Sequence, residues 1–138
     1  MSETTQQLAA DLIAAWNAHD VEQVAAFYAP DYEGVDVAQP ASRRGLDAVR
    51  NTLTRYLCAF PDLHFTPDEI VAQDNQAAVA WTARGTHQGV LMNIPPTGRA
   101  IQVRGVSFFT VRDGKIIRAL HIWDVAGLLR AIGLLPEL

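Results

Sequence analysis

The chain has 138 residues, of which 49% are hydrophobic, and a formal net charge of −4 from 11 basic and 15 acidic residues. This length predicts one folded domain over residues 1–138, because a chain of about 150 residues buries roughly 70% of its unfolded surface in one core. The acidic balance and the lack of a basic run argue against a nucleic-acid or membrane-lipid partner.

The first part of the chain is predicted to be mainly helical. Apolar residues at helical spacing indicate a first helix over residues 4–16 and a short second helix over residues 20–28. A short strand over residues 32–37 is expected next. A third helix is predicted over residues 45–60, and Pro61 ends it because proline disfavours helix in the residue before it.

After this helix the apolar pattern changes to a period of two, which is typical of strands. The predicted strands lie near residues 63–73, 76–87, 100–112 and 115–124. Asp113-Gly114 is the clearest turn signal, because a type I′ turn needs positive φ at both positions. A short final helix should follow Asp124. Helices segregated from an antiparallel set of strands predict an α+β fold, and a strongly curved sheet around a helix would form a cone with a pocket.

Asp124 is the first candidate for chemistry. It follows Ile116, Leu120 and Ile122 by strict alternation on one face of the last predicted strand. If that face lines a cavity, the carboxyl group is placed to act as a general acid or base. An aspartate directly before a helix is also a natural N-cap. The pattern leaves both roles open, and one side chain can serve both.

His121 competes with Asp124 for the cavity. It lies on the opposite face of the same strand, together with Ile117 and Trp123. Only one face of a strand can line a single cavity unless a bulge intervenes, and the local pattern does not say which face that is.

Five further side chains are candidates with plainer alternatives. His87 precedes a loop rich in glycine and proline, where a hydrogen-bonded histidine at the rim of a site is the common case. Asp36 ends the short strand and is by default a solvated carboxylate. Arg104 lies within a strand, where its charge needs solvent or a partner. Trp81 and Phe108, like Trp123, are either core aromatic residues or flat walls for a ring system.

Other classes of site lack support. The four histidines, at positions 19, 64, 87 and 121, are not at metal-ligand spacing, and the glycine motifs that bind nucleotides do not occur. The lone Cys58 excludes an internal disulfide and suggests a reducing compartment. Polar residues interrupt the apolar residues near the N-terminus, and no apolar run is long enough to span a membrane. We expect a soluble cytoplasmic protein whose chemistry needs no metal or cofactor.

Five segments together resemble the motifs of one known family. They are WTARGTHQG at residues 81–89, IPPTGR at 94–99, DGKI at 113–116, Trp123-Asp124, and GLL at 127–129. The family is that of the SnoaL-like polyketide cyclases, or ester cyclases, within the nuclear transport factor 2-like superfamily. The resemblance implies a cone-shaped α+β barrel, in which a curved antiparallel sheet wraps around three N-terminal helices and encloses an apolar pocket. It also implies a homodimer or homotetramer built through the sheets.

The resemblance suggests roles for two aspartates. In characterised cyclases, an aspartate near the end of the last strand is the acid/base of an intramolecular aldol ring closure, and Asp124 is the matching residue. Residues 31–45 also resemble ketosteroid isomerases of the same superfamily, whose general-base aspartate corresponds to Asp36. No tyrosine here clearly matches the oxyanion donor of those isomerases.

The sequence therefore predicts a cofactor-independent cyclase or isomerase that acts on a hydrophobic, polyketide-like carbonyl compound. Its predicted catalytic residues are Asp124, His87 and Asp36. Its predicted substrate-binding residues are Trp81, Arg104, Phe108, His121 and Trp123.

Two other functions remain open. A limonene-type epoxide hydrolase would use Arg104 and Asp124, although the second aspartate of that mechanism is missing from the Arg104 strand. A hydrophobic small-molecule binding protein without chemistry is the other alternative. An Asp124 engaged only with the amides of the last helix would favour binding or a simple structural role.

Overall fold

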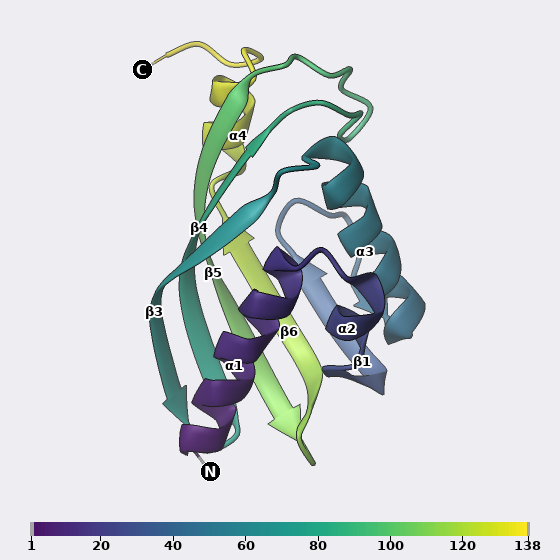
Figure 1. Ribbon diagram of the computed structural model, residues 1–138, viewed down its shortest axis with the longest axis vertical. Helices are drawn as coiled ribbons and strands as arrows, with labels where there is room; N and C mark the ends of the chain where they lie inside the picture. The colour runs from purple at the N-terminus through teal and green to yellow at the C-terminus, as the bar shows by residue number, and fades with distance from the viewer. Residues whose placement is uncertain (1, 138) are drawn as a thin grey trace.

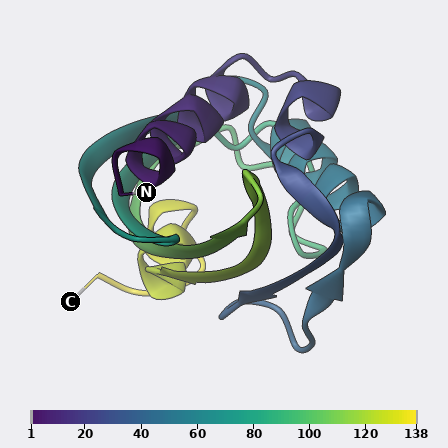
Figure 2. The same ribbon diagram turned by 90° about the horizontal axis from the view of Figure 1, so that it is seen from below.

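A strongly bent sheet, with helices α1, α2 and α3 on its concave side, forms the framework of the protein (Figures 1 and 2). The computed structural model describes residues 2–137. The helices are α1 (Ser2–Asn17), α2 (Val21–Ala25), α3 (Gly45–Ala59) and α4 (Val125–Ala131). The strands are β1 (Tyr28–Asp36), β2 (Arg43–Arg44), β3 (His64–Gln73), β4 (Gln76–Thr86), β5 (Ala100–Arg112) and β6 (Lys115–Trp123).

The six strands form one sheet in the order β2-β1-β6-β5-β4-β3. The α+β prediction is confirmed, but two of its details were wrong. The sheet does not close into a barrel, because β2 and β3 remain its two edges. The sheet is also mixed, because β1 pairs in parallel with β6 whereas every other pairing is antiparallel. Strand patterns in the sequence identify strands, but they do not identify partners about 85 residues apart.

The boundary between the second helix and the first strand differs from the prediction. Helix α2 begins after Asp20 as expected, but the chain is already extended at Tyr28, which pairs with Ile116 of β6. The register shifts between Tyr28 and Glu33. Pro30 lies within this shift, and proline cannot donate a hydrogen bond to a strand ladder. Long-range pairing therefore overrides the local helical pattern here.

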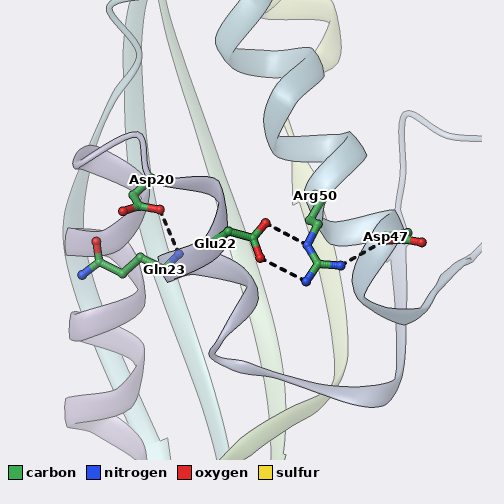
Figure 3. Close-up of polar contacts among 5 residues, drawn as sticks. All are labelled: Asp20, Glu22, Gln23, Asp47 and Arg50. Carbon is green, nitrogen blue, oxygen red and sulfur yellow. Dashed lines mark hydrogen bonds and ion pairs between the residues drawn. The ribbon is translucent and has the colours of Figure 1, made fainter.

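Polar contacts cap α2 and link it to α3 (Figure 3). The Asp20 carboxylate caps α2 by accepting a hydrogen bond from the Gln23 backbone N–H at 3.0 Å. The Arg50 guanidinium donates to Glu22 at 2.9 and 3.1 Å and to Asp47 at 2.9 Å. These ion pairs are solvent-exposed, so we expect them to orient the two helices more than to stabilise the fold.

The apolar core lies between the concave face of the sheet and the helices. Helix α1 contributes Leu12, which is 1% exposed, and α3 contributes Leu53, which is 0% exposed. Asn17, the last residue of α1, pairs with the backbone of Phe65 in β3 through two hydrogen bonds of 2.8 and 2.9 Å. Burial and this pair of bonds together fix α1 across the sheet.

A bulge in β6 decides which side chains face the core. The register shifts where Arg118 pairs with Thr110 but Ile116 pairs with Val111. Ile116 is therefore fully buried, whereas Leu120 and Ile122 are exposed on the convex side. The predicted apolar face that joined Ile116 to Ile122 is interrupted by this bulge, as such an irregularity reverses the alternation of side chains.

Asp124 caps the last helix. Its Oδ1 atom accepts a hydrogen bond from the Gly127 backbone N–H at 2.8 Å. A side chain at position 127 would collide with the Asp124 carboxylate, so glycine permits this close approach. The capping role that the sequence left open is thus present in the structure.

Among residues 2–137, no helix combines the length and the apolar character that crossing a bilayer requires.

The cap gives a first prediction. Asp124→Ala should lower the free energy of unfolding by about 1 kcal/mol, because an orphan amide of α4 loses its partner. Asp124→Asn should change it little, because asparagine caps helices about as well. Urea denaturation of the two variants measures the difference, and equal losses in both would contradict the cap.

Candidate active site

An apolar cavity of about 130 Å³ lies between the concave face of the sheet and helices α1 and α3. Its apolar walls include Leu12, Trp16, Phe60, Phe65, Ile101 and Phe109. The ring of Phe65 meets Trp16 and Trp81 edge to face, at centroid distances of 5.4 and 5.2 Å. Such packing fixes one wall as a rigid aromatic surface.

Three polar side chains line this cavity from one row across the sheet. Asp36 of β1 is paired with His121 of β6, and His121 is paired with Ser107 of β5. All three residues line the cavity. Neighbouring residues across strands lie about 4.5–5.5 Å apart, so the strand register alone brings these groups together.

Asp36 carries the one carboxylate among the described residues that line the cavity. Its Oδ1 atom accepts hydrogen bonds from the Trp123 indole Nε1 and from the Ala38 backbone N–H, each at 2.8 Å. Its Oδ2 atom accepts a longer one, of 3.5 Å, from the Tyr56 hydroxyl. Both short bonds fall on Oδ1, which leaves Oδ2 as the oxygen with room for a proton from a ligand.

A chain of hydrogen bonds orients His121. The Trp81 indole Nε1 donates to the Ser107 Oγ at 2.9 Å, and this Oγ lies 2.7 Å from the His121 Nδ1. An indole can only donate, so Ser107 is free to donate its own proton to Nδ1. This arrangement satisfies the Trp81 indole, the Ser107 hydroxyl and His121 Nδ1 when the imidazole proton is on Nε2. His121 Nε2 has no hydrogen-bond partner among residues 2–137 and is thus available as a donor.

Gly105 makes room for both tryptophans. It lies between Trp81 and Trp123 in the next row of the sheet. A Cβ atom at this position would lie 2.5 Å from Trp81 Cζ2 and 2.7 Å from Trp123 Cβ. The indoles that donate to Ser107 and Asp36 can occupy these positions only because Gly105 has no side chain between them.

Burial sets the protonation states of the neighbouring groups. It lowers the pKa of the His121 imidazole below its usual 6.5, and the negative charge of Asp36 opposes this shift. Burial also raises the pKa of the Tyr56 phenol to about 12, an effect that the charge of Asp36 strengthens. At neutral pH, His121 is therefore uncharged and Tyr56 is protonated.

Four of the eight predicted site residues meet at this cavity. They are Asp36, Trp81, His121 and Trp123. The other four are not among its lining residues. Arg104 and Phe108 are exposed on the convex side of the sheet, and Asp124 is exposed at the start of α4.

His87 has a different environment. Its ring is fully buried against Phe60, and its Nδ1 accepts a hydrogen bond from the Thr97 backbone N–H at 3.3 Å. Gly98 in turn donates a backbone hydrogen bond to the His87 carbonyl at 2.8 Å. The histidine thus holds the loop between β4 and β5 in shape.

Two residues that line the cavity, Tyr56 and Ser107, were not predicted from the sequence. Tyr56 follows Val49 and Leu53 at helical spacing in α3, so its position on the inner face could have been predicted from the sequence. Ser107 interrupts the buried alternation of Val103 and Phe109 in β5. A polar residue in such an apolar series is the signal that identifies it.

Among the described residues, no three His, Cys, Asp or Glu side chains come together in a way that could hold a metal ion.

The chain is similar to one known family and to solved structures. The family model of the SnoaL-like polyketide cyclases matches residues 6–132. AclR from Streptomyces galilaeus, a candidate hydroxylase, is 27% identical with a TM-score of 0.89, over 100% of this chain and 86% of AclR. IdmH from Streptomyces antibioticus, a candidate polyketide cyclase, is 28% identical with a TM-score of 0.81, over 94% of this chain and 98% of IdmH.

A more distant structure shows the fold alone. A protein from Catenulispora acidiphila with a ketosteroid isomerase-like fold has a TM-score of 0.80 at 16% identity, over 93% of each chain. No curated protein sequence matches the chain.

The lowered pKa of His121 predicts a loss of stability in mild acid. As the pH falls below about 6.5, the unfolded chain takes up a proton at this residue at a higher pH than the folded protein does. The free energy of unfolding should therefore decrease from pH 7.5 to pH 5, and His121→Gln should decrease less. Urea denaturation at both pH values measures the two slopes. Equal slopes would show that His121 is not the group responsible.

Proposed function

The chain belongs to the SnoaL-like polyketide cyclase family, and from this premise we propose that it catalyses cofactor-independent ring closure or isomerisation of a hydrophobic carbonyl compound. The general base of the proposed reaction is Asp36. The observation that supports this choice is the position of its carboxylate at an otherwise largely apolar cavity, with Oδ2 free of short hydrogen bonds.

The proposed reaction moves protons and makes one carbon–carbon bond. Asp36 takes a proton from the carbon next to a substrate carbonyl, and the C–H electron pair becomes an enolate. The enolate carbon attacks a second carbonyl of the same molecule, whose π electrons move to its oxygen. The carboxylic acid of Asp36 then returns its proton to that alkoxide. The product is an isomer of the substrate, so no oxidant, reductant or co-reactant is needed.

Two neutral donors support the developing negative charge in this scheme. In this scheme uncharged His121 donates from Nε2 and Tyr56 donates from its protonated phenol, and both residues line the cavity with Asp36. Donors fixed in place before the reaction stabilise an oxyanion without reorganisation. The cavity walls contribute by holding the two reacting carbons together, and well-oriented intramolecular reactions gain roughly 7–11 kcal/mol.

Asp124 fits this role less well. Its carboxylate is bound to the start of α4, and the residue does not line the cavity. The epoxide-hydrolase alternative loses support for a similar reason, because Arg104 also lies outside the cavity. The binding-protein alternative predicts the same cavity without turnover, and kinetic measurements separate it from the enzyme.

The base is tested by proton exchange. We expect the protein to exchange α-protons of cyclic and aryl β-keto esters for deuterium in D₂O, and Asp36→Asn to slow this exchange roughly 100- to 10,000-fold. NMR spectroscopy of the substrate measures the rate. Asp124→Asn is the matched control and should exchange at the wild-type rate. If the Asp124 variant lost exchange and the Asp36 variant kept it, the assignment would be overturned.

We also propose that a second copy of the chain covers the convex face of the sheet. Val35, Leu120, Phe108, Ala78 and Val71 follow one another across five paired strands on this face. Phe108 is 46% exposed and Val71 is 58% exposed. A continuous exposed apolar row of this kind is typical of protein interfaces.

A charged residue in this row tests the homodimer. Phe108→Lys should convert the dimer to a monomer in sedimentation-velocity experiments, because lysine cannot be buried against the apolar partner. Asn51→Lys, which adds the same charge on the exposed side of α3, should leave the dimer intact. A wild-type protein that sediments as a monomer at all concentrations would contradict the proposal.

A further inference from the structure

A second pocket, of about 50 Å³, adjoins the polar side of the cavity. Six residues line both spaces: Trp16, Tyr28, Asp36, Thr52, Tyr56 and His121. The proposed catalytic groups therefore lie where the two pockets meet. A ligand that reacts at Asp36 can place its apolar body in the cavity and another group in the second pocket.

The second pocket differs from the cavity in its charge. It is lined by Arg43 of β2 and Arg55 of α3, whereas no arginine or lysine among residues 2–137 lines the cavity. Both arginines are half-buried. The only carboxylate that lines the second pocket among the described residues is that of Asp36. The pocket thus contains two positive charges and one negative charge.

Neither arginine is neutralised by an ion pair within residues 2–137. Arg43 donates a hydrogen bond to the amide oxygen of Gln39 at 2.9 Å, and no salt bridge involves Arg43 or Arg55. Their neighbours Arg44 and Arg50, which do not line either pocket, do pair with carboxylates at 2.9 Å. Half-buried arginines without a carboxylate partner are favourable sites for an anionic ligand.

The two positive charges also reach the proposed active site. Burial raises the pKa of Tyr56, the charge of Asp36 adds to this effect, and the charges of Arg55 and Arg43 act against it. Tyr56, whose hydroxyl donates to Asp36, is therefore within the field of both guanidinium groups. An anion held by these arginines would lie beside the reacting atoms.

We propose that Arg43 and Arg55 bind a carboxylate group of the substrate, so that the natural ligand is an apolar carbonyl compound with a free acid at one end. A guanidinium group presents paired N–H donors that match the two oxygens of a carboxylate. The carboxylate fixes the orientation of the ligand, and its apolar rings fill the cavity beyond Asp36. The part of this inference that concerns turnover rests on the proposed function, whereas the binding preference does not.

A matched pair of ligands tests the preference. Isothermal titration calorimetry with 2-naphthylacetate and 2-naphthylacetamide compares an acid with a neutral ligand of nearly the same shape. We expect the wild-type protein to bind the acid about tenfold more tightly, or better. The double variant Arg43→Gln/Arg55→Gln should bind the two ligands equally, through loss of affinity for the acid alone. The charge-matched control Arg84→Gln/Arg118→Gln should keep the wild-type preference.

Two results would overturn the inference. One is equal binding of acid and amide by the wild-type protein, a result that does not depend on whether any variant folds. The other is an acid preference that survives in the Arg43→Gln/Arg55→Gln protein.

Asp36→Asn separates this inference from the proposed function. This variant should bind the acid at least as tightly as the wild type, because a negative charge next to the second pocket is removed. An acid preference in a wild-type protein without α-proton exchange would refute the proposed function and support the carboxylate site. Exchange that depends on Asp36, together with equal binding of acid and amide, would support the proposed function and refute the carboxylate site.

Discussion

The parallel pairing of β1 with β6 is the contact on which the polar part of the cavity depends. This pairing sets Asp36 beside His121, and the antiparallel pairing of β6 with β5 extends the row to Ser107. A shift of one residue in either register would turn these side chains to the convex face. The position of the carboxylate is thus a property of the sheet as a whole, in which the neighbouring ladders on both sides restrain β6.

Hydrogen bonds from tryptophans then fix the polar groups in place. The Trp123 indole donates to Asp36, and the Trp81 indole donates to Ser107. Each tryptophan supplies both an apolar wall and one N–H donor, so the polar atoms are satisfied without adding charge to the cavity. Gly105 permits this arrangement because the two indoles need the space that its side chain would occupy. The row of polar residues and the row of tryptophans are neighbours in one sheet and support each other.

The two faces of the sheet carry different functions in our proposals. The concave face, covered by α1 and α3, holds the acid/base groups and the apolar walls (Figure 2). The convex face carries the exposed apolar row that a second copy would cover. Alternation along the strands makes this separation possible, because Ser107 and Phe108 are adjacent in sequence but face opposite ways. The charged and apolar parts of the proposed ligand site are also separate. The arginines lie on β2 and α3 and line the second pocket, whereas the apolar walls line the cavity.

The sequence by itself determined the local elements, because their causes are local. Helical spacing, Asp20, Pro61 and the Asp113-Gly114 turn placed most of the helices and strands, and both turn residues have the positive φ that was expected, 52° and 75°. Motif resemblance also indicated the correct family and matched Asp36 to the general-base aspartate of ketosteroid isomerases. The tertiary structure alone decided which candidates meet. The bulge in β6 turns His121 and Trp123 inward, and the parallel ladder brings Asp36 to them from about 85 residues away in the chain. Asp124 is adjacent to Trp123 in the sequence, yet its carboxylate turns to the Gly127 amide, because the start of α4 within reach offers it a hydrogen bond. Strand partners and bulges depend on contacts between distant residues, and a pattern read along a single chain does not contain them.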